Sequence, residues 1–138
     1  MTDVFKTILS GLLLFILSQY TLEFIFKPIK KFKGTIGEID NKIKYYSNVL
    51  LNTGIKDEVI NEISRDLRRL SCDLESEYKQ IPIKWLFSGF DLIPCKNQIS
   101  EVAKELIRLS NLGGQNNFVS DCEKSINIIR EKLNIPLL

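Results

Sequence analysis

The sequence predicts an all-α protein in which an N-terminal transmembrane helix is followed by a cytoplasmic four-helix bundle. Beyond residue 33, apolar residues recur every three or four positions, which is the spacing of one face of a helix. No segment alternates apolar and polar residues between turn residues, as a half-buried strand would. We therefore expect two parts, namely residues 1–33 with the span and its basic flank, and residues 34–138 with the bundle.

The first part contains an apolar run that is long enough to cross a membrane. Residues 7–22 carry no charge, and an apolar FIF triplet follows Glu23. About 20 helical residues at roughly 1.5 Å each cover about 30 Å, the hydrocarbon thickness of a bilayer. A signal peptide requires a small-residue cleavage site after this run, whereas bulky Gln19 and Tyr20 follow Leu17. The run by itself also allows the buried core helix of a soluble protein.

A group of lysines follows the span and predicts its orientation. These basic residues are Lys27, Lys30, Lys31 and Lys33. The other end has only Lys6, which Asp3 offsets, so the positive-inside rule places the lysine-rich flank in the cytoplasm. We expect a single-pass membrane protein with its N-terminus outside, a placement that the resemblance described below extends to the bacterial inner membrane. The lysines either bind lipid headgroups, at about 1 kcal/mol each, or only stop transfer of the chain. Phe32 is expected at interface depth.

Small and hydroxylated residues form one stripe along the predicted span. At 100° per residue they fall within an arc of roughly 100°. They are Thr7, Ser10, Gly11, Leu14, Ser18 and Thr21. Three explanations remain open: close packing between the spans of several chains, the lining of a pore, or coincidence. The first two imply a homo-oligomer in contact with membrane lipid.

The second part predicts four amphipathic helices. Their apolar positions extend over residues 36–50, 59–78, 99–112 and 118–133. Gly54 and Gly113 are suited to end the first and third helices, and Pro82 and Pro136 the second and fourth. The apolar, aromatic stretch 83–94 has no sustained period and predicts a packed connector. Upstream, Pro28 is expected to kink or break the junction between the span and the bundle.

The composition excludes several common chemistries. The chain has no histidine, so it can form neither a Ser-His or Cys-His nucleophile pair nor a histidine-containing zinc site. Neither GxxxxGK[ST] nor GxGxxG occurs. Cys72, Cys95 and Cys122 lack metal-ligand spacing, and we expect free, mostly buried thiols. We therefore expect no catalytic residue, no metal and no cofactor. The net charge of +2 also argues against direct sequence-specific binding of nucleic acid.

One polar cluster stands out in the sequence SRDLRRLSCDL. Arg65, Arg68 and Arg69 are predicted to share one side of the second bundle helix, beside its apolar face. Guanidinium groups there suit a phosphate, a carboxylate or the acidic residues of a neighbouring subunit. The alternative is pairing within the helix, for which Asp66 and Asp73 are within reach.

Three segments carry a resemblance to a known group of proteins. They are KPIKKFKGTIGEI after the span, ISRDLRRLSCDL, and ELIRLSNLGG. With these, the chain resembles small single-pass bacterial membrane proteins with a HEPN-like helical domain, similar to the membrane accessory proteins of type VI-B CRISPR systems. The resemblance implies a bundle that assembles in a ring, gathers several spans into a pore and enhances antiphage defence. It also implies a functional link to an RNA-guided nuclease or a nucleotide second messenger.

Two functions follow as hypotheses. The first is an oligomeric, membrane-anchored antiphage defence effector or accessory that assembles a pore or depolarises the inner membrane. The second is a membrane-tethered module that binds a nucleotide, a cyclic oligonucleotide or a protein without pore activity. The arginines lie where HEPN domains tend to carry an Arg-x(4-6)-His motif, but no histidine follows them. Without the imidazole, the usual acid-base route of a ribonuclease is missing, so we expect no enzyme.

Overall fold

The computed structural model describes residues 2–50, 57–82, 84, 93–111 and 118–135, and these residues contain no strand. The elements are α1 (Thr2–Thr21), the π-helical turn η1 (Leu22–Phe26), α2 (Lys27–Leu50), α3 (Asp57–Gln80), α5 (Lys96–Asn111) and α6 (Phe118–Lys132). The all-α prediction is therefore confirmed for the described part of the chain. The turns expected at Gly54 and Gly113, the end at Pro136 and most of the connector 83–94 lie outside it.

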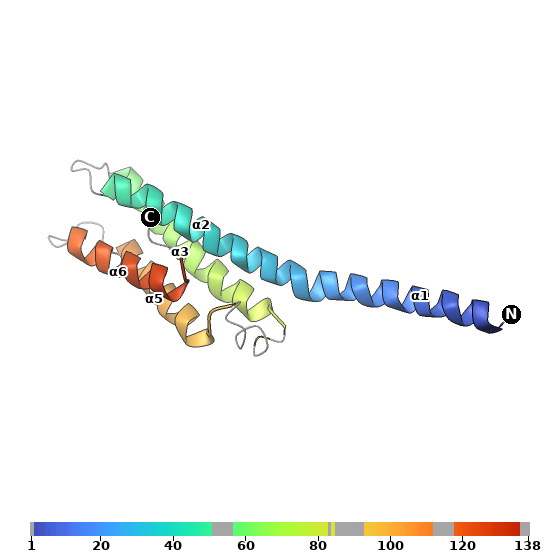
Figure 1. The fold of residues 1–138 in the computed structure, drawn as a ribbon. Coiled ribbons are helices and arrows are strands. Elements are labelled where there is room, and N and C mark those ends of the chain that lie inside the picture. The colour runs from blue at the N-terminus through green and yellow to red at the C-terminus, as the bar shows by residue number, and fades with distance from the viewer. Residues whose placement is uncertain (1, 51–56, 83, 85–92, 112–117, 136–138) are drawn as a thin grey trace.

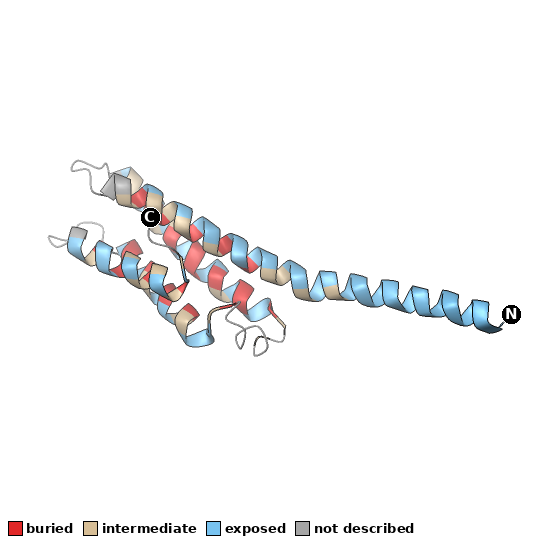
Figure 2. Ribbon diagram, viewed as in Figure 1, coloured by how far each residue is buried: buried red, intermediate tan, exposed pale blue. Residues whose placement is uncertain are grey.

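The first three elements follow one another as a single long helix. It extends over Thr2–Ser47, 46 residues, and its first half projects away from the other helices (Figure 1). Residues 2–20 are all exposed, as the uniform pale blue of this half shows (Figure 2). This helix is long and apolar enough to cross a membrane.

The helix continues through Pro28, so the break expected there is wrong. Within η1 the backbone widens, and the Lys27 N–H donates to the carbonyl of Leu22, five residues earlier. Proline lacks an N–H and its ring crowds the carbonyl of the preceding turn. A wide π-helical turn directly before Pro28 provides room for the ring, which lets the helix pass the proline without ending.

The helices α2, α3, α5 and α6 pack against one another as a bundle. α3 contacts both α2 and α5, and α6 contacts α5 and, over a smaller area, α2. The core face of α3 consists of Ile63, Leu67, Leu70, Leu74 and Tyr78, and that of α5 of Ile99, Val102, Leu106 and Leu109. These are the apolar positions that the helical period predicted. Each fully buried large side chain contributes about 1.5–3 kcal/mol, so this shared core accounts for the packing of the bundle.

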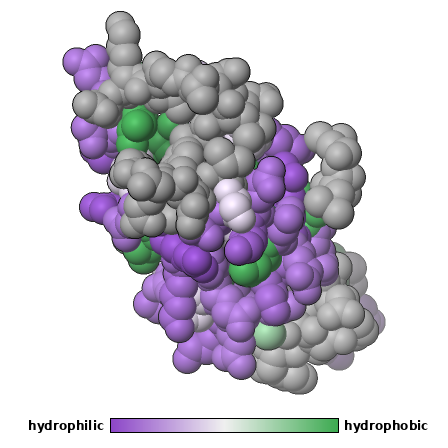
Figure 3. All heavy atoms as spheres, turned by 90° about the vertical axis from the view of Figure 1, so that its left-hand side faces the viewer, coloured by the Kyte–Doolittle hydropathy of each residue, from purple (hydrophilic) through white to green (hydrophobic). Residues whose placement is uncertain are grey.

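The surface of the bundle differs in character from that of α1. Among the described residues, the large exposed hydrophobic side chains lie between Val4 and Phe26, with only Tyr45 and Ile107 elsewhere. The end of the bundle distant from α1 is mostly hydrophilic where it is described, with small separate hydrophobic areas (Figure 3). The described bundle thus has the polar exterior of a water-exposed domain, and the apolar surface is concentrated on the projecting helix.

Two expectations about individual side chains are corrected. Phe32 is fully buried rather than at interface depth, with its ring centroid 5.8 Å from that of Tyr78. The reason is that the apolar face of α2 extends back from Ile39 by the three-and-four spacing. Cys72 and Cys95 are exposed, whereas Cys122 is buried.

Candidate functional site

The hydroxyl groups of the stripe on α1 are all bonded within their own helix. Thr7 donates to the carbonyl of Asp3, Ser10 to Thr7, Ser18 to Phe15 and Thr21 to Leu17, at 2.8–2.9 Å. Because the hydroxyl protons are satisfied, this stripe can lie in lipid without an outside acceptor. The oxygen lone pairs still accept bonds from water or another helix. Beside Gly11 nothing lies within 4 Å of where a Cβ would be, so a neighbouring helix can approach closely there.

The lysines that follow the span divide into two pairs. Lys27 forms an ion pair with Glu23, one turn earlier, and Lys31 Nζ lies 3.4 Å from the buried Glu77 on α3. Lys30 and Lys33 are exposed and have no ion pair among the described residues. Lys30 and Lys33 are therefore the lysines most available to lipid headgroups.

The structure separates the arginines that the sequence pattern placed on one side of α3. Arg68 turns toward α5, where its Nε donates to Ser110 Oγ at 3.2 Å and its Nη2 to Asn111 Oδ1 at 2.7 Å. Arg69 turns toward α2 and lies 2.6 Å from Glu38. Arg65 is exposed. Successive residues point about 100° apart on a helix, so Arg68 and Arg69 reach different neighbours and their two guanidinium groups do not converge.

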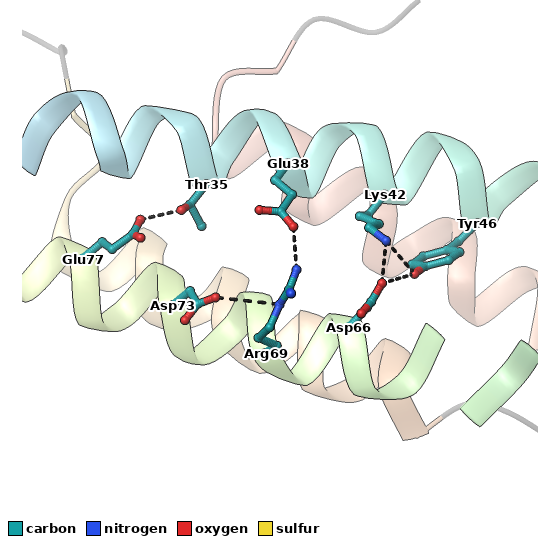
Figure 4. A network of polar contacts seen from close by, with 8 residues as sticks. All are labelled: Thr35, Glu38, Lys42, Tyr46, Asp66, Arg69, Asp73 and Glu77. Atoms are coloured by element: carbon teal, nitrogen blue, oxygen red, sulfur yellow. Dashed lines mark hydrogen bonds and ion pairs between the residues drawn. The ribbon is translucent and has the colours of Figure 1, made fainter. Parts of the chain in front are cut away.

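A row of polar side chains joins α2 to α3, and Figure 4 shows it. The residues are Thr35, Glu38, Lys42 and Tyr46 on α2, and Asp66, Arg69, Asp73 and Glu77 on α3. At one end, Thr35 donates to the buried Glu77 at 2.5 Å. At the other end, Asp66 Oδ2 accepts from Lys42 at 2.5 Å and from Tyr46 at 2.7 Å. This row fixes the register of two antiparallel helices, a geometry that sequence spacing on one helix does not show.

The protonation states of this row follow from its contacts. The hydrogen bonds from Lys42 and Tyr46 lower the pKa of Asp66, and the hydrogen bond to Asp66 raises the pKa of Lys42. Burial, with a further effect from Asp66, raises the pKa of Tyr46 to about 12. At neutral pH the carboxylate is ionised, the ammonium charged and the phenol neutral. None of these three groups therefore changes its protonation state near pH 7, and their contacts hold α2 against α3.

A cavity of about 440 Å³ lies between the end of α3 and the start of α5. Its described lining consists of Glu75, Tyr78, Lys79, Lys84, Lys96, Ile99 and Ser100. Lys84 Nζ donates to the carbonyl of Lys79 at 3.0 Å and lies 5.2 Å from the centre of the Tyr78 ring. Sequence reasoning missed this site because Lys79 and Lys96 flank the connector 83–94 and Lys84 lies within it. The only signal was the presence of lysines at both ends of that apolar stretch.

Metal-ligating groups are not gathered in the described part of the chain. No set of three or more Cys, Asp or Glu residues lies close enough there to hold a metal ion. The acidic residues at the end of α3 diverge: Asp73 lies 4.0 Å from Arg69, Glu77 faces Thr35, and Glu75 lines the cavity. Among the described residues, the candidate sites are therefore the striped face of α1 and the lysine-lined cavity.

Comparison with known proteins adds no assignment. No protein-family model matches this chain, and neither a curated protein nor a solved structure matches it. The functional argument therefore depends on the geometry of the chain itself.

Proposed function

We propose that this chain is a single-pass protein of the bacterial inner membrane, with its N-terminus outside and its bundle in the cytoplasm. The observation that supports this most is the bare apolar surface of residues 2–20, all of them exposed. Soluble monomers rarely expose a contiguous apolar surface of this extent. A core helix of a soluble protein would be covered, and this one packs against no other described part of the chain. The lysines at its C-terminal end support the orientation.

Within this placement, we propose an oligomeric antiphage defence effector or accessory that assembles a pore or depolarises the membrane. Its bundle would be HEPN-like, and its trigger a partner such as an RNA-guided nuclease or a nucleotide second messenger. The continuity of the helix Thr2–Ser47 supports this function. Since the same helix forms the span and one side of the bundle, any change in bundle packing between subunits is transmitted to the span as rotation or tilt.

The alternative is a tethered module that binds a ligand through Arg65, Arg68 and Arg69. It has less support, because Arg68 is engaged by Ser110 and Asn111 and Arg69 by Glu38. A ligand would have to replace these contacts at two separate places. The pore or depolarisation proposal requires no such rearrangement.

Membrane potential in cells that express the full chain tests the proposal. The sharpest comparison is Ser18→Leu against Gln19→Leu, since both replace a polar residue by leucine and the two positions point about 100° apart. A voltage-sensitive dye should report depolarisation by the wild type and by Gln19→Leu. Ser18→Leu, which fills the striped face, should restore most of the potential.

Native mass analysis of the detergent-solubilised protein supplies the second measurement. A closed ring of several chains supports a pore, whereas a monomer or dimer supports a simple tether. A stable monomer that leaves the membrane potential unchanged would reject the proposal. Equal effects of Ser18→Leu and Gln19→Leu would reject the striped face as the surface that matters.

A further inference from the structure

The lysine-lined cavity lies at the end of the bundle where the span enters it. Two contacts establish this position. Glu77, on the last turns of α3, meets Lys31 near the start of α2, and Gln80 shares a surface depression with Phe24 and Lys27. Figure 1 shows the same arrangement, with the end of α3 beside the junction of α1 and α2. The cavity is thus carried by the part of the bundle closest to the apolar helix.

The lining of this cavity is strongly basic. Lys79, Lys84 and Lys96 line it against a single acid, Glu75. Among the described residues, none of the three ammonium groups lies within 4.0 Å of a carboxylate. The described lining thus carries three cations from three points along the chain against one acid, an excess of positive charge that favours binding of an anion.

The remaining features of the cavity suit a phosphate group. Ser100 adds a hydroxyl donor to its lining, and Tyr78 and Ile99 supply an apolar wall. The first turn of α5, which begins at Lys96, brings the positive end of a helix dipole. The volume of about 440 Å³ falls within the range of roughly 300–1,000 Å³ that is common for small-molecule sites.

We propose that this cavity binds a phosphate group and that the phosphate is the headgroup of an anionic membrane lipid. The lipid source rests on the membrane placement proposed above, because that placement brings the cavity to the negatively charged cytoplasmic leaflet. Lysine binds phosphate as a point charge on a flexible stem. In this placement the bound headgroup holds the end of the bundle against the bilayer, and the exposed Lys30 and Lys33 add positive charge near the same membrane surface.

Lipid titration of the full chain in a neutral detergent, followed by native mass spectrometry, tests the site. The probes are short-chain phosphatidylglycerol and phosphatidylcholine. The double variant Lys79→Gln with Lys96→Gln removes two exposed lysines of the lining and keeps Lys84, which packs on Tyr78. The matched control, Lys104→Gln with Lys124→Gln, removes two exposed lysines that do not line the cavity.

The wild type should bind phosphatidylglycerol in preference to phosphatidylcholine. The cavity variant should bind phosphatidylglycerol about thirtyfold more weakly, because it removes two lysines that each contribute about 1 kcal/mol near a charged surface. The control should stay within about twofold of the wild type. Equal affinities of the two double variants would overturn the proposal, as would equal binding of the two lipids by the wild type.

A third probe, glycerol 3-phosphate, separates a lipid headgroup from a soluble phosphate. If the wild type binds glycerol 3-phosphate as tightly as the lipid, and the cavity variant loses this binding, the phosphate site is upheld and the lipid is rejected as its source. Vesicle flotation and membrane potential are measured in parallel. A cavity variant that still depolarises the membrane but no longer binds the lipid would support the site independently of the pore. Failure of the wild type to float with vesicles would reject the membrane placement and the lipid source together.

Discussion

The hydroxyl of Tyr46 on α2 donates a 2.7 Å hydrogen bond to Asp66 Oδ2 on α3. Lys42, one turn earlier on α2, contacts the same oxygen at 2.5 Å. One carboxylate therefore holds two side chains of the helix that also forms the projecting apolar segment (Figure 4). This contact, with the Thr35–Glu77 bond at the other end of the row, fixes how that long helix sits against the bundle.

The first prediction concerns Asp66→Asn. Removing the charge should lower the free energy of unfolding of the bundle at pH 7 by about 1 kcal/mol, the usual worth of a partly buried hydrogen-bonded group. Because its contacts lower the pKa of Asp66 below its ordinary 3.8, the stabilisation is complete above that value and is lost as the pH falls through the lower, folded-state pKa. Denaturant unfolding in mild detergent, followed by circular dichroism, measures the free energy of unfolding of the wild type and of Asp66→Asn. The difference between the two should be smaller near pH 3 than at pH 7.

A matched control for this variant is Asp73→Asn on the same helix. Asp73 is half exposed, and its nearest cation, on Arg69, is 4.0 Å away, so its loss should change stability by less than about 0.5 kcal/mol. Equal losses of unfolding free energy in Asp66→Asn and Asp73→Asn would contradict the role of Asp66. So would a difference between the wild type and Asp66→Asn that grows on acidification.

The second prediction concerns the bundle core. Leu70 is fully buried, whereas Ile107 on α5 is 44% exposed. Leu70→Ala should reduce the free energy of unfolding by about 3 kcal/mol, because it removes buried methyl groups and leaves a cavity. Ile107→Ala should cost less than about 1 kcal/mol. Denaturant unfolding in the same detergent measures both, and similar costs would contradict the assigned core.

The third prediction uses the native thiols to test orientation. Cys72 and Cys95 are exposed on the bundle, so a membrane-impermeant maleimide should label them in spheroplasts only after permeabilisation. Thr2→Cys, at the opposite end of the span, should be labelled before it. Labelling of the native thiols in intact spheroplasts would reverse the proposed orientation.

The buried thiol predicts a different result in the same experiment. Burial, with a smaller effect of Asp121, raises the pKa of Cys122 to about 11, so its reactive thiolate is scarce near neutral pH. Mass spectrometry of the permeabilised sample should find Cys122 unmodified in the folded protein and labelled after denaturation. Rapid labelling of Cys122 in the folded state would contradict its buried position.

The fourth prediction distinguishes the two neighbouring arginines. Arg68→Ala should cost about 1 kcal/mol, since Arg68 bonds the buried Ser110 and also Asn111. Arg69→Ala should cost less than about 0.5 kcal/mol, because its partner Glu38 and Arg69 itself are both about half exposed. Thermal unfolding of both variants checks this order. A larger loss of stability in Arg69→Ala than in Arg68→Ala would contradict the structure. The charge swap Glu38→Arg with Arg69→Glu should recover the stability that Arg69→Glu alone loses.

Much of the fold was predictable from spacing alone. The buried faces of α3 and α5, including Leu70, Leu74 and Leu106, follow from apolar residues three and four positions apart. That period is a local property of a helix, so it needs no knowledge of what lies opposite. The apolar run without charges at residues 7–22 predicted a helix long enough to span a membrane, but its exposure is a result of the structure, because the run alone also allowed a buried core helix.

Spacing and composition were thus sufficient to predict the helices of the bundle, the apolar face of each, and the change from an apolar helix to a bundle. The folded structure was needed to show that the helix continues through Pro28, that Arg68 and Arg69 contact different helices, that Phe32 belongs to the core, and that Lys79 and Lys96 border one cavity. The reason is physical. Periodicity specifies the direction of a side chain around its own axis, whereas polar partners and cavities depend on which helices become neighbours and in what register.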